Sequence, residues 1–251
     1  MDPQVAFDAA VVIPTVLRPS LLGAVRSVYA QDLEGRVQVM IDVDKPLGDP
    51  SLLGRLRAEC PAHMHLTVLD LGYSTSARHG GVYSNAYSCA LRTILSYAAN
   101  SLRIAYLDDD NWWAPAHLSG LVAALDGHDF AFSRRWYVDP ATDAPLAVDV
   151  WESVGVGAGA YAPDYGGFVD TSSLMLEKGR CHLLFPLWAI AFYPGGNGED
   201  RTVFQALKEM RGRSTGKATC FYRLNPADPN HAVQLGWIDE AHAAATAPAQ
   251  G

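Results

Sequence analysis

The chain of 251 residues is poor in cysteine, has no long apolar run and carries no excess of basic residues. Its four cysteines are scattered, and no two have the spacing of zinc ligands or suggest a disulfide framework. No apolar run approaches the roughly 20 residues that a membrane-spanning helix needs, and the acidic start lacks the basic region of a signal peptide. We therefore expect free thiols in a reducing compartment, a cytoplasmic location and no membrane span.

The charge balance argues against another large class of proteins. The net charge is −8 and the isoelectric point is about 5.4, whereas general nucleic-acid binders usually show a basic face. We therefore expect no nucleic-acid partner. A single nucleotide remains possible as a ligand, because a bound divalent cation can neutralise a diphosphate.

The first half of the chain alternates apolar runs with helical patterns. Short apolar runs closed by polar residues predict strands at 9–15, 37–46, 64–72 and 103–110. Amphipathic spacing predicts helices at 18–31, 49–60, 82–98 and 114–127. This order indicates an α/β fold with a mainly parallel sheet that is covered by helices on both faces.

The pattern changes in the second half of the chain. Strands are expected at 130–139 and 168–178, and the glycine-rich segment 151–167 between them is interpreted as a mobile loop. A chain of this length favours one domain, here covering 1–240. The low-complexity residues 241–251 are expected to form a flexible tail.

Polar or charged residues follow all four strands that are predicted in the first half. In open α/β sheets, ligands bind beyond the carboxyl ends of the strands, which meet at one edge. The residues at this edge are Thr15, Arg18, Asp42, Asp44, Tyr73, Ser74, Arg78, Asp108, Asp109 and Asp110. Their convergence supports a ligand site more strongly than any one motif does.

Three adjacent carboxylates at the end of the fourth strand suit a hard divalent cation. Mg²⁺ and Mn²⁺ prefer oxygen ligands and usually take one or two carboxylates plus substrate phosphates. With strict alternation, Asp108 and Asp110 would face one way and Asp109 the other. One or two carboxylates could then hold a metal while another accepts a hydroxyl hydrogen bond. The alternative is a solvated acidic turn that includes Asn111.

Four stretches together resemble the nucleotide-sugar-dependent glycosyltransferases of the GT-A fold, especially those of family 2. The stretch "VVIPTVLRPSLLGAVRSVYAQ" resembles their first strand and helix, and "SARHGGVYSNAYSCAL" resembles their Ala-Arg-Asn-x-Gly segment, with His79 in place of the usual asparagine. The stretch "AYLDDDNWWAPAHL" resembles their Asp-x-Asp region, and "GNGEDRTVFQAL" resembles their Gly-Glu-Asp block. The resemblance covers roughly residues 9–125 and 195–210.

The resemblance implies a GT-A fold, which is Rossmann-like, with a mainly parallel sheet, flanking helices and a smaller acceptor-side subregion. Residues 1–130 would then bind the nucleotide and residues 131–240 the acceptor. The implied activity is metal-dependent transfer of a sugar from a nucleoside-diphosphate sugar, with a UDP-sugar favoured, to an unknown carbohydrate or lipid-linked acceptor. Mn²⁺ or Mg²⁺ would be the cofactor, and the transfer would invert the sugar.

The resemblance also implies roles for residues at the sheet edge. The implied nucleotide ligands are Thr15, Arg18, Asp44 or Asp42, Arg78, Asp108 and Asp109, and the implied metal ligands are Asp110 and Asp108. Thr15 would contact the base, Asp44 the base or the ribose, and Asp109 the ribose. Other interpretations stay open, because Arg18 and Arg78 could be surface cations at helix starts and Thr15 could simply end a strand.

Two acidic residues lie where residues 196–210 pass from a predicted loop into a predicted helix. An inverting transfer needs a carboxylate that takes the proton of the acceptor hydroxyl. The resemblance favours Asp200 as this base, with Glu199 binding the acceptor or the donor. The alternative is that both residues only complement the helix macrodipole.

Two tryptophans and one late histidine complete the set of candidates. Trp112 and Trp113 could form an apolar platform for a sugar ring, although tryptophan is more often a core residue, so one of the two is expected to face the ligand. His231 could be an additional metal ligand, because some GT-A enzymes take a late histidine in this role. The alternative is a loop histidine without any ligand.

Three rival functions are weighed against sugar transfer. A protein of the same fold could bind sugar nucleotides without effective transfer. A nucleotidyltransferase would usually carry a glycine-rich loop after the first strand, whereas "PTVLRPS" contains no glycine. A haloacid-type phosphatase would need an Asp-x-Asp-x-Thr motif after an early strand, and the sequence lacks one there.

Overall fold

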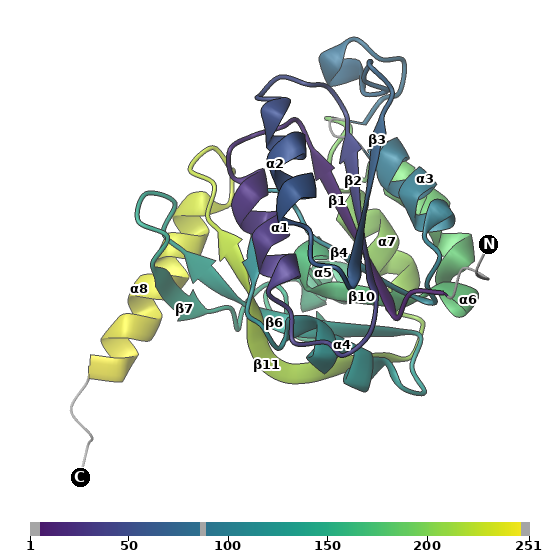
Figure 1. The fold of residues 1–251 in the computed structure, drawn as a ribbon. Coiled ribbons are helices and arrows are strands. Elements are labelled where there is room, and N and C mark those ends of the chain that lie inside the picture. Colours follow the sequence, from purple (N-terminus) through teal and green to yellow (C-terminus); the bar gives the residue numbers. More distant parts are fainter. Residues whose placement is uncertain (1–5, 86–88, 247–251) are drawn as a thin grey trace.

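The computed structural model describes residues 6–85 and 89–246 (Figure 1). The first four strands are β1 (Ala9–Thr15), β2 (Val37–Val43), β3 (Met64–Asp70) and β4 (Arg103–Tyr106). They lie in the order β3-β2-β1-β4, and all their pairings are parallel. The predicted α/β fold is confirmed, because these apolar runs form the parallel part of one sheet.

The second half of the chain extends this sheet with mixed pairings. Strand β10 (Leu174–Glu177) is antiparallel to both β4 and β6 (Phe130–Val138). Strand β11 (Gly212–Arg223) runs parallel to β6. Strand β5 (Trp112–Trp113) pairs antiparallel with β11, and strand β7 (Pro145–Val148) pairs antiparallel with β6. The full order is β3-β2-β1-β4-β10-β6-β11-β5, with β7 beside β6.

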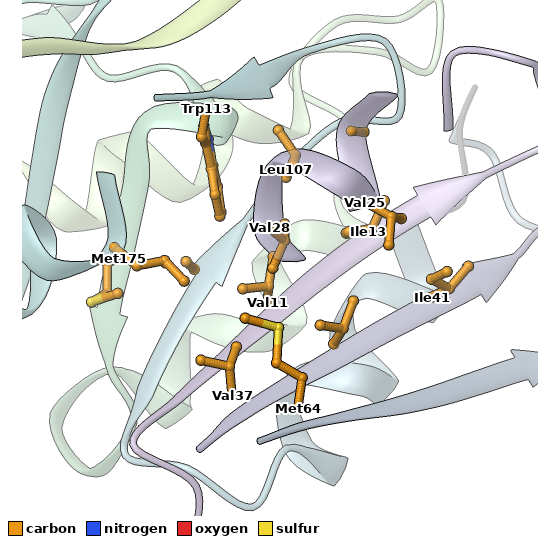
Figure 2. Close-up of a cluster of buried hydrophobic side chains, with 14 of the residues drawn as sticks. Val11, Ile13, Val25, Val28, Val37, Ile41, Met64, Leu107, Trp113 and Met175 are labelled. Atoms are coloured by element: carbon orange, nitrogen blue, oxygen red, sulfur yellow. The ribbon is translucent and has the colours of Figure 1, made fainter. Parts of the chain in front are cut away.

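Helices cover both faces of the sheet and contribute to its two larger hydrophobic cores. Helices α1 (Leu21–Tyr29), α2 (Ser51–Glu59) and α4 (His117–Leu125) contribute to the core shown in Figure 2. Helices α3 (Cys89–Ala98), η3 (His182–Ala189) and α7 (Glu199–Leu207) contribute to the other core. In β1, Val11 and Ile13 enter the first core and Ala10 and Val12 the second, because side chains alternate along a strand.

One predicted helix is shorter than expected. The spacing of aromatic and aliphatic residues predicts a helix over 82–98, but α3 begins at Cys89. Tyr83 instead lies in an isolated bridge with Ser76, and its side chain is exposed. Tyr87, the next residue of the predicted stripe, lies outside the described residues.

The glycine-rich segment 151–167 contains regular structure where an irregular loop was expected. Strand β8 (Gly155–Val156) pairs antiparallel with β9 (Gly167–Phe168), and α5 (Ala162–Tyr165) lies between them. The run 168–178, which the sequence predicts as one strand, is divided into β9, the 3₁₀ turn η2 (Thr171–Ser173) and β10. The mobility of the segment stays a prediction.

The C-terminal region also differs from the expectation. Helix α6 (Lys178–Cys181) leads into η3, and helix α8 (His231–Thr246) ends the described chain. The tail expected from residue 241 is therefore helical as far as Thr246, and 247–251 lie outside the described residues. All four cysteines are free thiols, as expected. No helix within the described residues is long and apolar enough to cross a membrane.

Candidate active site

A pocket of about 440 Å³ opens at the carboxyl ends of β1 and β4. These strands are neighbours, and the chain passes from β1 to β2 on the other side, so the strand order reverses between them. Such switch points hold ligands in open α/β sheets. Of the predicted site residues, the lining includes Thr15, Arg18, Asp44, Arg78, Asp108, Asp109, Asp110 and Glu199. The predicted residues outside this lining are Asp200, His231, Trp112 and Trp113.

Asp109 joins the ends of β1 and β4. Its carboxylate accepts a 2.6 Å hydrogen bond from the Thr15 hydroxyl and forms an ion pair with the Arg18 guanidinium. Asp109 is only 2% exposed. The Thr15 hydroxyl in turn accepts a hydrogen bond of 2.8 Å from the amide of Leu17, which has a positive φ of 64°. The lone pairs of Asp109 therefore fix the turn that follows β1.

Asp108 has different partners from Asp109. Its Oδ1 accepts a hydrogen bond of 2.9 Å from Arg92, and its Oδ2 accepts one of 3.2 Å from Ser172. Strict strand alternation was the wrong expectation here, because β4 ends at Tyr106 and the three aspartates lie in a turn. The turn is closed by a hydrogen bond of 3.1 Å from the amide of Asn111 to the carbonyl of Asp108.

Asp110 is the most exposed of the three carboxylates, at 37% of its side chain, and lies 3.2 Å from Arg18. Burial raises the pKa of Asp110 to about 6, with Arg18 opposing and Asp108 and Asp109 adding to the rise. A divalent cation with diphosphate oxygens needs only one or two protein carboxylates, so Asp110 and the part-exposed Asp108 fit that role.

The described residues contain no group of three or more histidine, cysteine, aspartate or glutamate side chains arranged to hold a metal ion. His231, the predicted additional ligand, is the first residue of α8. Its Nδ1 is buried and has no hydrogen-bond partner in the described part of the chain. Asp228, whose carbonyl accepts the His231 amide, lines the pocket. His231 is thus close in sequence to the site, and its role stays a prediction.

The end of β2 supplies a second polar corner of the pocket. Asp44 accepts hydrogen bonds from the Ser74 hydroxyl at 2.7 Å and from Nδ1 of His79 at 3.0 Å. Asp42, the alternative that the sequence left open, is fully buried within β2 and is outside the pocket lining. Arg78 lines the pocket beside His79. Asp44 is therefore the carboxylate that faces this corner.

Glu199 and Asp200 occupy the first turn of α7, directly after Gly198, which adopts a left-handed conformation with φ 81°. Glu199 lines the pocket and lies 3.6 Å from Arg92. Burial and the neighbouring Glu199 raise the pKa of Asp200 to about 7, and Arg201 opposes this shift. A carboxylate whose pKa is near neutral pH has the proton affinity of a general base.

Arg92 is a site residue that the sequence analysis missed. It belongs to the inner stripe of α3, its side chain is 6% exposed, and its guanidinium lies over the ring of Trp188 at 4.9 Å. It pairs with Asp108 and approaches Glu199, so it links the aspartate turn after β4 with the first turn of α7. A charged residue within an otherwise apolar stripe was the signal that could have found it.

Arg223 and Tyr222 are also missed residues of the pocket lining, and they lie at the end of β11. The sequence analysis missed them because no motif in the sequence marks the end of β11 as part of the site. Arg223 pairs with Asp143 at 2.6 Å, and its guanidinium lies 5.5 Å from the Trp112 ring.

The two tryptophans have different environments. Trp113 is 3% exposed, stacks on His117 and donates its indole N–H to the carbonyl of Ser172. Its predicted role as a sugar platform is therefore corrected to a core role. Trp112 is partly buried and stacks on Phe221 at a centroid distance of 5.4 Å. It lies beside Arg223, which lines the pocket, and its contact with a sugar stays a prediction.

A buried ion cluster is connected to the acidic turn through Ser172. Arg135 forms ion pairs with Asp149, Glu152 and Asp170 at 2.7–2.9 Å. Asp170 also accepts a hydrogen bond from the amide of Ser172, whose hydroxyl donates to Asp108. The start of the glycine-rich segment is therefore fixed to β6 and to the pocket wall.

Solved structures of glycosyltransferases have a similar fold to this chain at low sequence identity. TarS from S. aureus in complex with UDP-GlcNAc matches with a TM-score of 0.61 and 14% identity, over 88% of this chain and 60% of that chain. The mannosyltransferase PcManGT from Pyrobaculum calidifontis, in complex with GDP-Man and Mn²⁺, matches with a TM-score of 0.58 and 14% identity, over 98% of this chain and 67% of that chain.

The chain spans about 60% of the length of the TarS chain that it matches. No protein-family model matches the sequence, and no curated protein matches it. The GT-A-like fold that the sequence predicts is therefore supported by the architecture of the sheet and by these structures together.

Proposed function

We propose that the protein is a glycosyltransferase that transfers a sugar from a nucleoside-diphosphate sugar, with a UDP-sugar favoured, to a hydroxyl of a carbohydrate or lipid-linked acceptor. One observation carries this proposal. The carboxylates of Asp108, Asp109 and Asp110 converge with Arg18 and Arg92 in a pocket at the switch point of a GT-A-like sheet. The nucleotide sugars bound by TarS and PcManGT support the same ligand class.

The pocket has separate regions for the parts of such a donor. Arg18 and Arg92 bring positive charge next to the acidic turn, where a diphosphate would lie. Mn²⁺ or Mg²⁺ would be held by Asp110, with Asp108, and would neutralise the diphosphate leaving group as a Lewis acid. Asp44 and Arg78 form the opposite corner, where the base and ribose would lie.

The proposed base is Asp200, and its reaction would invert the sugar. In this scheme Asp200 takes the proton of the acceptor hydroxyl as the oxygen attacks the sugar from the side opposite the diphosphate. The raised pKa of Asp200 suits this step, because a carboxylate with a higher pKa accepts a proton more readily. Glu199, which borders the pocket, would orient the acceptor or the donor.

A thermal-shift screen tests the ligand class. UDP, GDP, dTDP and CDP would each be added with Mn²⁺ and with EDTA, because a ligand bound only by the native state raises the melting temperature. We expect UDP with Mn²⁺ to give the largest shift. The absence of a shift with any of the four nucleotides would contradict the proposal.

A second function is favoured by one specific observation. Asp200 is outside the pocket lining, whereas a base must reach the acceptor hydroxyl. A sugar-nucleotide-binding protein without effective transfer would have this arrangement. UDP binding combined with no turnover of UDP-sugars, in the presence of a broad panel of acceptors, would favour that alternative.

A further inference from the structure

We infer that His79, oriented by Asp44, recognises the base of the nucleotide and selects bases that present an N–H at the centre of their pairing edge, so that uracil is bound in preference to cytosine. The inference rests on the proposed function, because it concerns the nucleotide of the proposed donor. It differs from what the resemblance implies, where Asp44 or Thr15 would contact the base and an asparagine would usually stand at position 79.

The first observation is that the Asp44 carboxylate is largely occupied by the protein itself. One oxygen accepts from Ser74 and the other from Nδ1 of His79, and the side chain is only 2% exposed. The amide of Asp44 also donates to the carbonyl of Thr15 at 3.0 Å. Asp44 is therefore placed to hold His79 and is poorly placed to be the main contact of the base.

The second observation is that this contact determines the tautomer of His79. An ionised carboxylate can only accept hydrogen bonds, so Nδ1 must carry the hydrogen. In the neutral imidazole, Nε2 is then an acceptor. The His79 side chain is 20% exposed and lines the pocket, so an acceptor nitrogen is available there.

The third observation is that hydrogen bonds define the backbone on both sides of His79. The 3₁₀ turn η1 (Ala77–His79) is capped by Ser76, whose hydroxyl accepts the amide of Arg78. The amide of Gly81 donates to the Ser76 carbonyl at 2.8 Å, and a Cβ at Gly81 would overlap the backbone of Thr75. The ring of His79 is therefore held both by its backbone and by Asp44.

These contacts give the corner a defined pattern of donors and acceptors. The Nε2 of His79 accepts, while the guanidinium of Arg78, which also lines the pocket, can only donate. The pairing edge of uracil offers an N–H donor between two carbonyl acceptors and matches both groups. Cytosine has an unprotonated acceptor nitrogen at the same position, which would face the acceptor of His79. A site built to hydrogen-bond one group rejects an analogue that lacks it.

Calorimetric titration of UDP and CDP, each with Mn²⁺, tests the inference on the full chain. We compare the wild type, His79→Ala and the control His63→Ala, which removes an exposed histidine outside the pocket. We expect the wild type to bind UDP at least about tenfold more tightly than CDP, which corresponds to about 1.4 kcal/mol. His79→Ala should lose this preference by weakening UDP alone, and His63→Ala should keep it.

The Asp44→Asn variant provides a second test that retains the imidazole. An amide can donate to Nδ1, which would convert Nε2 into a donor, so the preference for UDP over CDP should shrink. Melting temperatures of all variants confirm that each is folded.

The possible outcomes separate the two proposals. Equal weakening of UDP and CDP by His79→Ala, or an unchanged preference, overturns the inference about His79 and leaves the proposed function standing. Failure of the wild type to bind UDP, CDP, GDP or dTDP overturns both.

Discussion

The hydroxyl of Thr15 donates a 2.6 Å hydrogen bond to the carboxylate of Asp109, and this bond joins the ends of two neighbouring parallel strands that are 94 residues apart in sequence. Both side chains are buried. The bond therefore makes the geometry of the acidic turn depend on the first strand. It also changes the interpretation of Thr15, because its hydroxyl is occupied by the protein before any ligand binds.

We predict that Thr15→Val destabilises the protein by about 1–3 kcal/mol, because it leaves the buried carboxylate of Asp109 with one donor fewer. Thr15→Ser keeps the hydroxyl and should cost less. Urea denaturation of both variants measures the difference. Equal stability of Thr15→Val and the wild type would show that the bond contributes little.

The second prediction concerns Arg92. Arg92→Met should lower the free energy of unfolding by about 1–3 kcal/mol, because it leaves Glu199 and the part-exposed Asp108 without their cation. Arg26→Ala, which breaks the exposed pair with Glu59, is the matched control and should cost much less, because exposed ion pairs are screened by solvent. Chemical denaturation gives both values, and similar costs for the two variants would contradict a central role of Arg92.

The third prediction separates chemistry from donor binding. Asp200→Asn should abolish sugar transfer, or donor hydrolysis, while the affinity for UDP with Mn²⁺ stays nearly unchanged, because the amide keeps the size but cannot accept the proton. The control is Asp164→Asn, an exposed acidic residue in the first turn of α5. Unimpaired transfer by Asp200→Asn would move the base to Glu199 or exclude the inverting scheme.

The fourth prediction follows from the raised pKa of Asp200, which is about 7 in the folded protein and 3.8 as its ordinary value. The folded state binds this proton more tightly, so the contribution of Asp200 to stability falls as the pH rises from about 4 to about 7 and stays low above that. Asp200→Asn should therefore melt at a higher temperature than the wild type at pH 8, with the gap closing towards pH 4.

Transfer should show the opposite dependence on pH, because the base must be deprotonated. The rate should rise with pH and level off above about 7. Melting curves and rates at matched pH values measure both trends. A melting difference between Asp200→Asn and wild type that does not change with pH would contradict the assigned pKa.

The parallel half of the sheet could be predicted from the sequence because its central strands β1 and β2 are buried on both faces and all four strands read as short apolar runs. The carboxyl ends of those strands were sufficient to place Thr15, Arg18, Asp44 and the three aspartates in one pocket. This worked because parallel connections bring all such ends to the same edge of a sheet.

Other features depend on contacts between distant residues and could not be predicted. Arg92 stands out in the sequence only as a charged residue within an apolar helical stripe, and its pairing with Asp108 could not be predicted. Trp113 is adjacent to Trp112, but only the pairing of β5 with β11 decides which ring enters the core. The glycines of 151–167 were compatible with a loop or with a short hairpin, and the ion pairs of Arg135 fix the start of that segment.

Calorimetric titration of UDP tests most directly whether the pocket is a metal-assisted nucleotide-sugar site. The wild type, Asp110→Ala and the exposed control Asp126→Ala would be titrated with Mn²⁺ and with EDTA. We predict that the wild type and the control bind UDP at least about tenfold more tightly with Mn²⁺, and that Asp110→Ala loses this gain. Equal affinity of the wild type for UDP with Mn²⁺ and with EDTA would contradict it.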